Sequence, residues 1–314
     1  MQPLLSCFWA ILFLVFTQFI IPLRALHEEP LRDFSFDSYK TAVENCFTVF
    51  ESQKSSLLTQ EPKSSVGIKI VAGFGEGLCT PPELVKAVIE ALIKRGYNRS
   101  KIFIWDCSES KLRISGFLPK LSERLPSYFD SCRVKTFDDP NSTDPEWFYE
   151  SSLAPALHYN PRYLYPLESY ENVKEARRSY LPVELFLDAD FWVHLPVPME
   201  HPNLGPWCAL ADSSFGMITN MERFLNFPAH MPIACAEINS IPELYEKHLL
   251  TIASLENAQF VGGLTFYPRF NLHQKKLWAA IDPKEIDEAW LALLNQNRRK
   301  KGFIPYPRPL YFLD

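Results

Sequence analysis

The pattern of apolar and polar positions predicts an α/β protein built around a parallel sheet. A short apolar run at 66–72 leads into a glycine-rich turn, and apolar residues at helical spacing follow Thr80. A second apolar run occupies 101–106. Thr80 and Glu83 fit a helix capping box, and Gly96 is expected to end the helix. A strand, a crossover helix and a second strand form a βαβ unit, so the two strands are expected to be parallel.

The same pattern predicts further elements along the chain. These are a helix over 37–60, strands over 185–196 and 249–253, and a helix from about 283 to 297. Between them, the tyrosine- and proline-rich segment 137–182 is long enough to indicate a functional loop or an ordered cover. No change in composition marks a linker, so residues 26–314 are expected to form one domain. We expect a mostly parallel, Rossmann-like sheet with helices on both faces and a pocket at the carboxyl ends of its parallel strands.

The N-terminal segment predicts export. Residues 4–23 are almost wholly apolar and about as long as a membrane-spanning helix, for which ~20 residues suffice. A small-residue site ends at Ala25, and polar residues follow it directly. We interpret residues 1–25 as a secretory signal peptide, which places the mature chain in the periplasm or outside the cell. The alternative is an uncleaved membrane anchor formed by residues 4–23, which would be the chain's only contact with a membrane.

Composition narrows the classes of partner and cofactor. The chain has 47% hydrophobic and 22% charged residues, as is typical of soluble globular proteins. With 32 Lys and Arg against 37 Asp and Glu, the net charge of −5 argues against binding to nucleic acid. Six cysteines follow the predicted cleavage site, at positions Cys46, Cys79, Cys107, Cys132, Cys208 and Cys235. An even number of cysteines in an exported chain permits disulfides, and buried free thiols are the alternative. The spacing contains no C-x-x-C, so an iron–sulfur cluster or a zinc ribbon is not expected.

The glycine-rich turn is a candidate anion site. Gly73, Gly75 and Gly77 lie between a predicted strand and a predicted helix, where backbone N–H groups can bind a phosphate or a carboxylate. A plain tight turn is the alternative. The dinucleotide fingerprint requires a further glycine where Leu78 stands, and Asp106 comes too late in the chain to contact a ribose. A nicotinamide cofactor is therefore not expected.

Several acidic residues and histidines are further candidates. Asp188-Ala189-Asp190 is predicted to close the apolar strand, and such a D-x-D can ligate the metal of a nucleotide-sugar in glycosyltransferases. Solvated carboxylates are the alternative. His194 and His201 flank the next segment, and a single histidine is more often structural than catalytic. Asp282 is expected to cap the last helix, with proline in the first helical position.

Several short segments of the chain occur in an order that is typical of one protein family. They are Thr80-Pro81-Pro82-Glu83-Leu84-Val85, Ile104-Trp105-Asp106, Gly116-Phe117, Asp190-Phe191-Trp192-Val193-His194-Leu195-Pro196-Val197 with His201, Ala236-Glu237-Ile238-Asn239-Ser240-Ile241-Pro242-Glu243-Leu244, Gln259-Phe260-Val261-Gly262-Gly263, and Asp282-Pro283 with Asp287. Over residues 64–314 the chain resembles a bacterial family catalogued as domain of unknown function 362. The resemblance implies an α/β fold, sometimes with an attached ferredoxin module, and no generally established activity.

The departures from the family pattern concern charged residues. Met199 stands where the family has a lysine, the block 210–216 contains no lysine, and Ser254 replaces an aspartate. A site that loses two cations and a carboxylate does not hold the same ligand with the same electrostatics. The sequence therefore indicates a degenerate or retuned active site. The polar candidates that remain are Lys69, Asp106, Asp190, His201, Asp282 and Asp287.

Three functional hypotheses follow. The first is an exported protein that binds a small molecule or an envelope protein through the glycine turn and the aromatic segment 147–180, with a ligand site formed by Lys69, Gly73, Gly75, Gly77 and Asp106. The second is a hydrolase- or isomerase-like enzyme, in which His201 moves a proton and one of Asp190, Asp282 and Asp287 orients it or binds a metal. The third is a metal-dependent glycosyltransferase that uses Asp188 and Asp190. The sequence specifies no cofactor and no metal-ligand set.

Overall fold

The computed structural model describes residues 26–53, 64–120, 127–151, 177–225 and 229–312. The predicted signal peptide, residues 1–25, lies outside these ranges, as does most of the tyrosine- and proline-rich segment. Within the described ranges, no helix combines the length and the hydropathy needed to cross a membrane.

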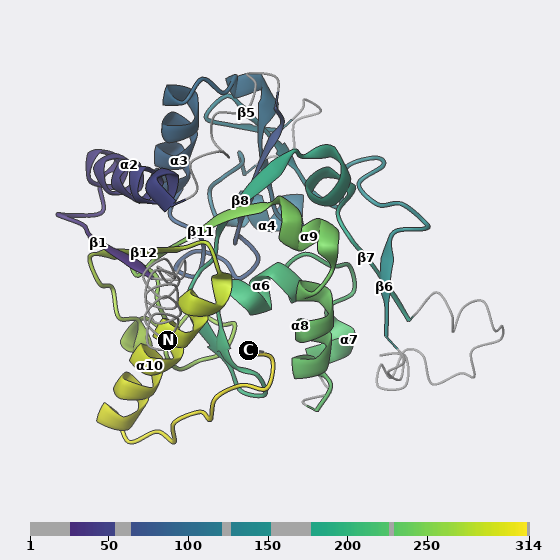
Figure 1. Ribbon diagram of the computed structural model, residues 1–314. Coiled ribbons are helices and arrows are strands. Elements are labelled where there is room, and N and C mark those ends of the chain that lie inside the picture. The colour runs from purple at the N-terminus through teal and green to yellow at the C-terminus, as the bar shows by residue number, and fades with distance from the viewer. Residues whose placement is uncertain (1–25, 54–63, 121–126, 152–176, 226–228, 313–314) are drawn as a thin grey trace, which may run out of the picture.

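The centre of the fold is an eight-stranded sheet in the order β1-β12-β11-β8-β2-β3-β5-β4 (Figure 1). The strands β11, β8, β2, β3 and β5 are parallel. On one side β12 pairs antiparallel with β11 and with the edge strand β1, and on the other the edge strand β4 pairs antiparallel with β5. In chain order the parallel strands follow the 3-2-1-4-5 arrangement of the Rossmann fold. The strands are β1 (His27–Pro30), β2 (Val66–Ile70), β3 (Ile102–Trp105), β4 (Tyr128–Phe129), β5 (Cys132–Lys135), β8 (Phe191–Leu195), β11 (His248–Ser254) and β12 (Lys276–Ala280).

Helices cover both faces of this sheet. Strand side chains alternate between the faces, so Phe191, Val193 and Leu195 of β8 pack on one side and Trp192 packs on the other. The first face is covered by α2 (Phe36–Gln53) and α3 (Pro82–Lys94), which lie together in Figure 1, and by the short α4 (Glu109–Ile114). The second face is covered by α6 (Ala209–Phe215), α7 (Glu222–Leu225), α8 (Met231–Asn239), α9 (Pro242–Lys247) and α10 (Pro283–Lys300). The predicted α/β architecture is thus confirmed.

Two short hairpins lie outside the main sheet. One pairs β6 (Phe148–Glu150) with β7 (Arg178–Tyr180), and the other pairs β9 (Met199–His201) with β10 (Gly205–Trp207). The first hairpin brackets residues 152–176, which lie outside the described ranges.

The first βαβ unit agrees with the prediction except at the start of its helix. Strands β2 and β3 pair in parallel, and Gly96 takes a left-handed φ of +92° just after α3. The predicted capping box is wrong, because Pro81 occupies the N-cap position without a side-chain hydrogen bond. The Thr80 hydroxyl is used elsewhere: Oγ1 accepts a hydrogen bond from Val71 N at 2.9 Å and donates to Leu195 O at 2.7 Å. Thr80 therefore joins the ends of β2 and β8.

The strand predicted over 185–196 is wrong in its first half. Residues Glu184–Asp188 form a single π-helical turn, and β8 begins only at Phe191. Asp188 and Asp190 thus precede the strand, at its amino end, and both are exposed. Asp190 Oδ2 accepts a hydrogen bond from Ser65 N at 2.6 Å. An apolar run does not distinguish a buried helical turn from a strand, and here the turn buries Leu185 and Phe186.

The remaining predicted elements agree closely with the structure. The helix predicted over 37–60 is α2, described as far as Gln53, and the strand predicted over 249–253 is β11. The last helix begins at Pro283 as expected but extends to Lys300. Asp282 is its N-cap, with a side chain that accepts a hydrogen bond from Lys284 N at 3.0 Å.

Candidate functional site

A buried charged cluster lies on the second face of the sheet. Lys69 of β2 and His194 of β8 are direct partners in the parallel register, so their side chains project to the same face. Asp212 of α6 lies over them, and its Oδ2 contacts Lys69 Nζ at 3.0 Å and His194 Nε2 at 2.7 Å. Lys69 and His194 are wholly buried, and Asp212 is 2% exposed. One carboxylate oxygen therefore connects two strands to one helix.

The cluster extends to the next strand through Asp106. Lys69 Nζ lies 3.6 Å from Asp106 Oδ1 and donates a hydrogen bond to the Ile70 carbonyl at 2.6 Å. Asp106 accepts backbone hydrogen bonds from Ala72 N at 2.6 Å and from Cys107 N at 2.7 Å. Lys69 and Asp106, both expected to contact a ligand, are instead paired inside the protein.

Burial and charge pairing set the protonation states in this cluster. Burial works against the charged form of Lys69, but Asp212 and Asp106 outweigh it and raise the pKa of the ammonium group. Burial likewise opposes ionisation of Asp212, but Lys69 and His194 hold its pKa below the usual range. For His194, burial dominates and lowers the pKa of the imidazole, whereas burial raises the pKa of Asp106. At neutral pH the cluster thus contains a charged Lys69, a charged Asp212 and a neutral His194.

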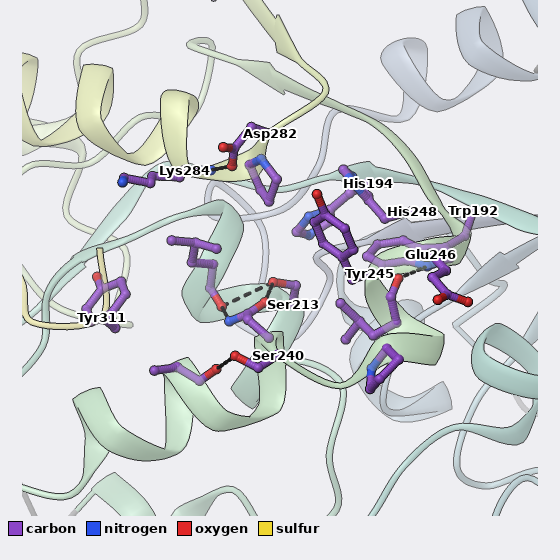
Figure 2. Close-up of a pocket in the computed structure, with 16 residues that line it drawn as sticks. Trp192, His194, Ser213, Ser240, Tyr245, Glu246, His248, Asp282, Lys284 and Tyr311 are labelled. Carbon is purple, nitrogen blue, oxygen red and sulfur yellow. Dashed lines mark hydrogen bonds between the residues drawn. The ribbon is translucent and has the colours of Figure 1, made fainter. Parts of the chain in front are cut away.

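A cavity of about 480 Å³ opens beside this cluster (Figure 2). His194 is part of its wall, and Trp192 and His248 lie near the starts of β8 and β11. The helical side of the wall comes from α6, α8, α9 and the first turn of α10. The lining residues include Leu210, Ser213, Asn239, Ser240, Tyr245, Glu246, Asp282, Lys284 and Tyr311. This cavity lies toward the amino ends of β8 and β11, whereas the sequence predicts a pocket at the carboxyl ends of the parallel strands.

The tautomer of His194 determines what it presents to the cavity. Because Nε2 faces the Asp212 carboxylate, this nitrogen carries the proton and donates it. The other nitrogen, Nδ1, is buried and has no hydrogen-bond partner among the described residues. A buried polar atom without a partner costs about 1–3 kcal/mol. His194 therefore has an unused acceptor atom in a side chain that lines the cavity.

The glycine turn after β2 is packed against aromatic rings. Gly75 and Gly77 have left-handed φ angles of +85° and +90°, and a Cβ on Gly77 would lie 2.7 Å from the Phe266 ring. Phe74, within the turn, stacks edge-on against Trp207 with ring centroids 5.9 Å apart. Gly73 lies beside the side chain of Lys111. This packing agrees with the alternative of a tight turn, in which backbone conformation favours glycine at Gly75 and Gly77 and close contact also requires it at Gly77.

The residues predicted to act together with His201 have separate partners. His201 of β9 is 8% exposed, lies against the Trp207 ring at 5.7 Å and accepts a hydrogen bond from Asn203 N at 3.3 Å. Asp287 is wholly buried and accepts hydrogen bonds from Ala209 N at 2.8 Å and Leu210 N at 2.7 Å. Its carboxylate thus caps the start of α6, and burial raises its pKa to about 7 against these two donors.

Of the predicted catalytic residues, only Asp282 lines the cavity with His194. Within the described ranges, no group of three or more His, Cys, Asp and Glu side chains is arranged to hold a metal ion. The six cysteines that follow the predicted cleavage site are unpaired thiols, and all but Cys107 are buried.

Asp212 is not among the residues predicted from the sequence, and His194 was predicted to be structural. A signal for both was present in the apolar pattern. Lys69 and His194 each interrupt a β-rich apolar run, and a buried ionisable group needs a partner of opposite charge or a hydrogen bond. Asp212, in a helix whose residues are all buried, meets that need.

Comparisons with known proteins leave the family open. No family model matches the sequence, and no curated protein matches it. Among solved structures, a crystal structure of a protein from Thermotoga maritima is similar, with a TM-score of 0.45 and 9% sequence identity. The match covers 85% of this chain and 59% of the Thermotoga protein.

Proposed function

We propose that the protein binds a small organic molecule in the cavity beside α8 and α9, and that His194 Nδ1 accepts a hydrogen bond from it. The observation that carries this proposal is the unpartnered Nδ1 in a wholly buried side chain that lines the cavity. A ligand that donates to Nδ1 relieves the cost of this unmade hydrogen bond, so the site favours an occupant with an N–H or O–H group.

The surroundings of His194 support a role in binding. Asp212 accepts the hydrogen bond from His194 Nε2–H, so Nδ1 carries no proton and stays an acceptor. The ammonium group of Lys69 keeps Asp212 ionised. The imidazole is thus fixed by groups behind it, and its orientation does not depend on the ligand. Preorganised polar groups of this kind reduce the entropic cost of binding. The cavity volume of about 480 Å³ is within the range typical of small-molecule sites.

The experiment that tests the proposal is a fragment screen by NMR. The protein is labelled with ¹⁵N in its histidines, and the Nδ1 and Nε2 resonances of His194 are assigned with the His194→Gln variant. Cationic, anionic and neutral compounds are then added one at a time. We expect at least one donor-bearing compound to shift Nδ1 of His194 and to lose affinity in His194→Gln. A screen in which no compound moves these resonances would overturn the proposal.

A second candidate function is proton transfer, since a carboxylate behind an imidazole is the arrangement that orients a general base. In this function His194 Nδ1 takes a proton from the bound molecule, and the imidazolium formed is stabilised by Asp212 at 2.7 Å. His194 then replaces His201 as the residue expected to move a proton in the hydrolase- or isomerase-like hypothesis. Exchange of a ligand C–H for deuterium in D₂O, present in the wild type and absent in His194→Gln, would support it.

A further inference from the structure

We propose that the occupant of this cavity is a small organic cation, a protonated amine attached to an apolar body. This inference rests on the proposed function and adds the chemical class of the ligand. It follows from three properties of the cavity wall: several hydrogen-bond donors there are already in use while one acceptor is not, carboxylates outnumber ammonium groups in the lining, and aromatic rings form part of the wall.

Four polar side chains of the wall already donate to, or lie against, acceptors within the protein. The Trp192 indole N–H donates to the Leu244 carbonyl at 3.3 Å, and the Tyr311 hydroxyl donates to the Pro206 carbonyl at 2.6 Å. The hydroxyl of Ser240 donates to the Ala236 carbonyl at 2.8 Å. On α6, the Ser213 hydroxyl lies 2.5 Å from Asn239 Oδ1.

The cavity lining also includes a residue with a hydrogen-bond acceptor that is not in use. Nδ1 of His194 has no partner among the described residues, and it cannot donate while Nε2 holds the proton. A ligand with only acceptor groups would therefore leave this atom unsatisfied. A ligand with N–H groups would satisfy it, so the wall selects a donor.

The charged side chains of the lining favour a cation over a neutral donor. Glu246 of α9 and Asp282 at the start of α10 supply two carboxylates, and Lys284 supplies one ammonium group (Figure 2). Lys69 and Asp212 do not line the cavity, and their opposite charges offset each other because Lys69 Nζ lies 3.0 Å from Asp212 Oδ2. The lining thus has an excess of one negative charge, which favours a positive ligand.

Aromatic rings complete the site. Trp192, Tyr245 and Tyr311 line the cavity, and Tyr245 is 69% exposed, so its ring can reach an entering ligand. The faces of such rings attract ammonium groups, by ~0.5–1 kcal/mol at exposed sites, and also pack against apolar bodies. A small aryl- or alkylamine combines the positive charge, the N–H donor and the apolar surface that these three properties call for.

The test compares three probes of similar shape and different charge. Phenethylamine supplies the cation, 2-phenylethanol the neutral donor and phenylacetate the anion, each titrated by NMR at neutral pH against the histidine- and tryptophan-labelled protein. We expect phenethylamine to bind about tenfold more tightly than either of the others. We also expect Glu246→Gln to weaken phenethylamine binding by a few-fold while leaving 2-phenylethanol unaffected. Tyr128→Ala, an exposed ring on the distant edge strand β4, is the matched control and should leave all three affinities unchanged.

The outcomes separate this inference from the function on which it rests. If 2-phenylethanol or phenylacetate binds at His194 as tightly as phenethylamine, or Glu246→Gln leaves phenethylamine binding unchanged, the cation class is overturned and small-molecule binding stands. If none of the three shifts His194, the cation class is overturned, and the broader screen decides the function. The Glu246 side chain is exposed, so the substitution tests charge without removing a buried group.

Discussion

His194 Nε2 lies 2.7 Å from Asp212 Oδ2, and this contact determines which nitrogen of the imidazole carries the proton. A carboxylate accepts only, so the contact keeps the proton on Nε2 and leaves Nδ1 as an acceptor. The same Asp212 oxygen accepts a hydrogen bond from Lys69 Nζ at 3.0 Å. Lys69 of the central strand β2 therefore helps to hold the carboxylate that orients His194. The arrangement makes specific predictions about stability and pH dependence.

Replacing Asp212 with asparagine is expected to destabilise the fold strongly. The shape of the side chain is kept, but Lys69, which is wholly buried, loses its nearest counter-charge, and Asp106 is 3.6 Å away. Removing one partner of a buried ion pair costs about 3–5 kcal/mol, which urea denaturation would measure as a lower midpoint. Asp188→Asn, at an exposed site, should change the free energy of unfolding by less than about 0.5 kcal/mol. Equal effects of the two substitutions would contradict the assigned role of Asp212.

Gly216→Ala is expected to displace Asp212. A Cβ at position 216 would lie 2.2 Å from Asp212 Oδ1 and 2.5 Å from the Asp212 carbonyl oxygen. Overpacking of this kind costs about 1–3 kcal/mol. Gly73→Ala is the control, because its Cβ would lie 3.7 Å from the flexible Lys111 side chain. We expect Gly216→Ala alone to shift the His194 resonances, and unchanged resonances would show that the carboxylate does not need this space.

Stability is expected to fall as the pH drops below the ordinary pKa of histidine, about 6.5. Burial lowers the pKa of His194 in the folded chain, so the unfolded chain takes up this proton first. Where the unfolded state binds more protons, the free energy of unfolding decreases with falling pH, here by at most about 1.4 kcal/mol per pH unit. His194→Gln lacks this group, so its stability should decline less between pH ~6.5 and ~5. Parallel declines in urea-denaturation series of the two proteins would rule out a buried neutral imidazole.

Asp287→Ala is expected to loosen α6 and thereby the position of Asp212. The substitution leaves Ala209 N and Leu210 N without their acceptor at a buried helix start, which costs about 1–3 kcal/mol. Faster hydrogen exchange of these two amides would report the effect locally. Asp282→Ala removes a hydrogen bond that caps the start of α10 and should cost about 1 kcal/mol without changing exchange in α6. Protected amides in α6 of the Asp287 variant would refute this role.

The α/β class, the first βαβ unit and the cap of the last helix were all readable from the sequence, because each depends on residues close together in the chain. Alternating apolar residues and a proline after Asp282 specify local geometry through short-range sterics and hydrogen bonds. Export by residues 1–25 and the resemblance over 64–314 stay predictions, and fractionation of cells that express the full chain would test the first of them.

Tertiary structure alone decided where the polar residues meet. Lys69 and Asp212 are 143 positions apart, and only the pairing of β2 with β8 and the packing of α6 on that face bring them into contact. The same packing assigned Asp106 and Asp287 to backbone hydrogen bonds and placed the cavity at the amino ends of the strands. Sequence spacing does not encode these contacts, because they depend on which faces of distant elements are buried together. The sequence determined that Lys69 and His194 stand in apolar strands, and the fold determined that they would be buried and share one carboxylate.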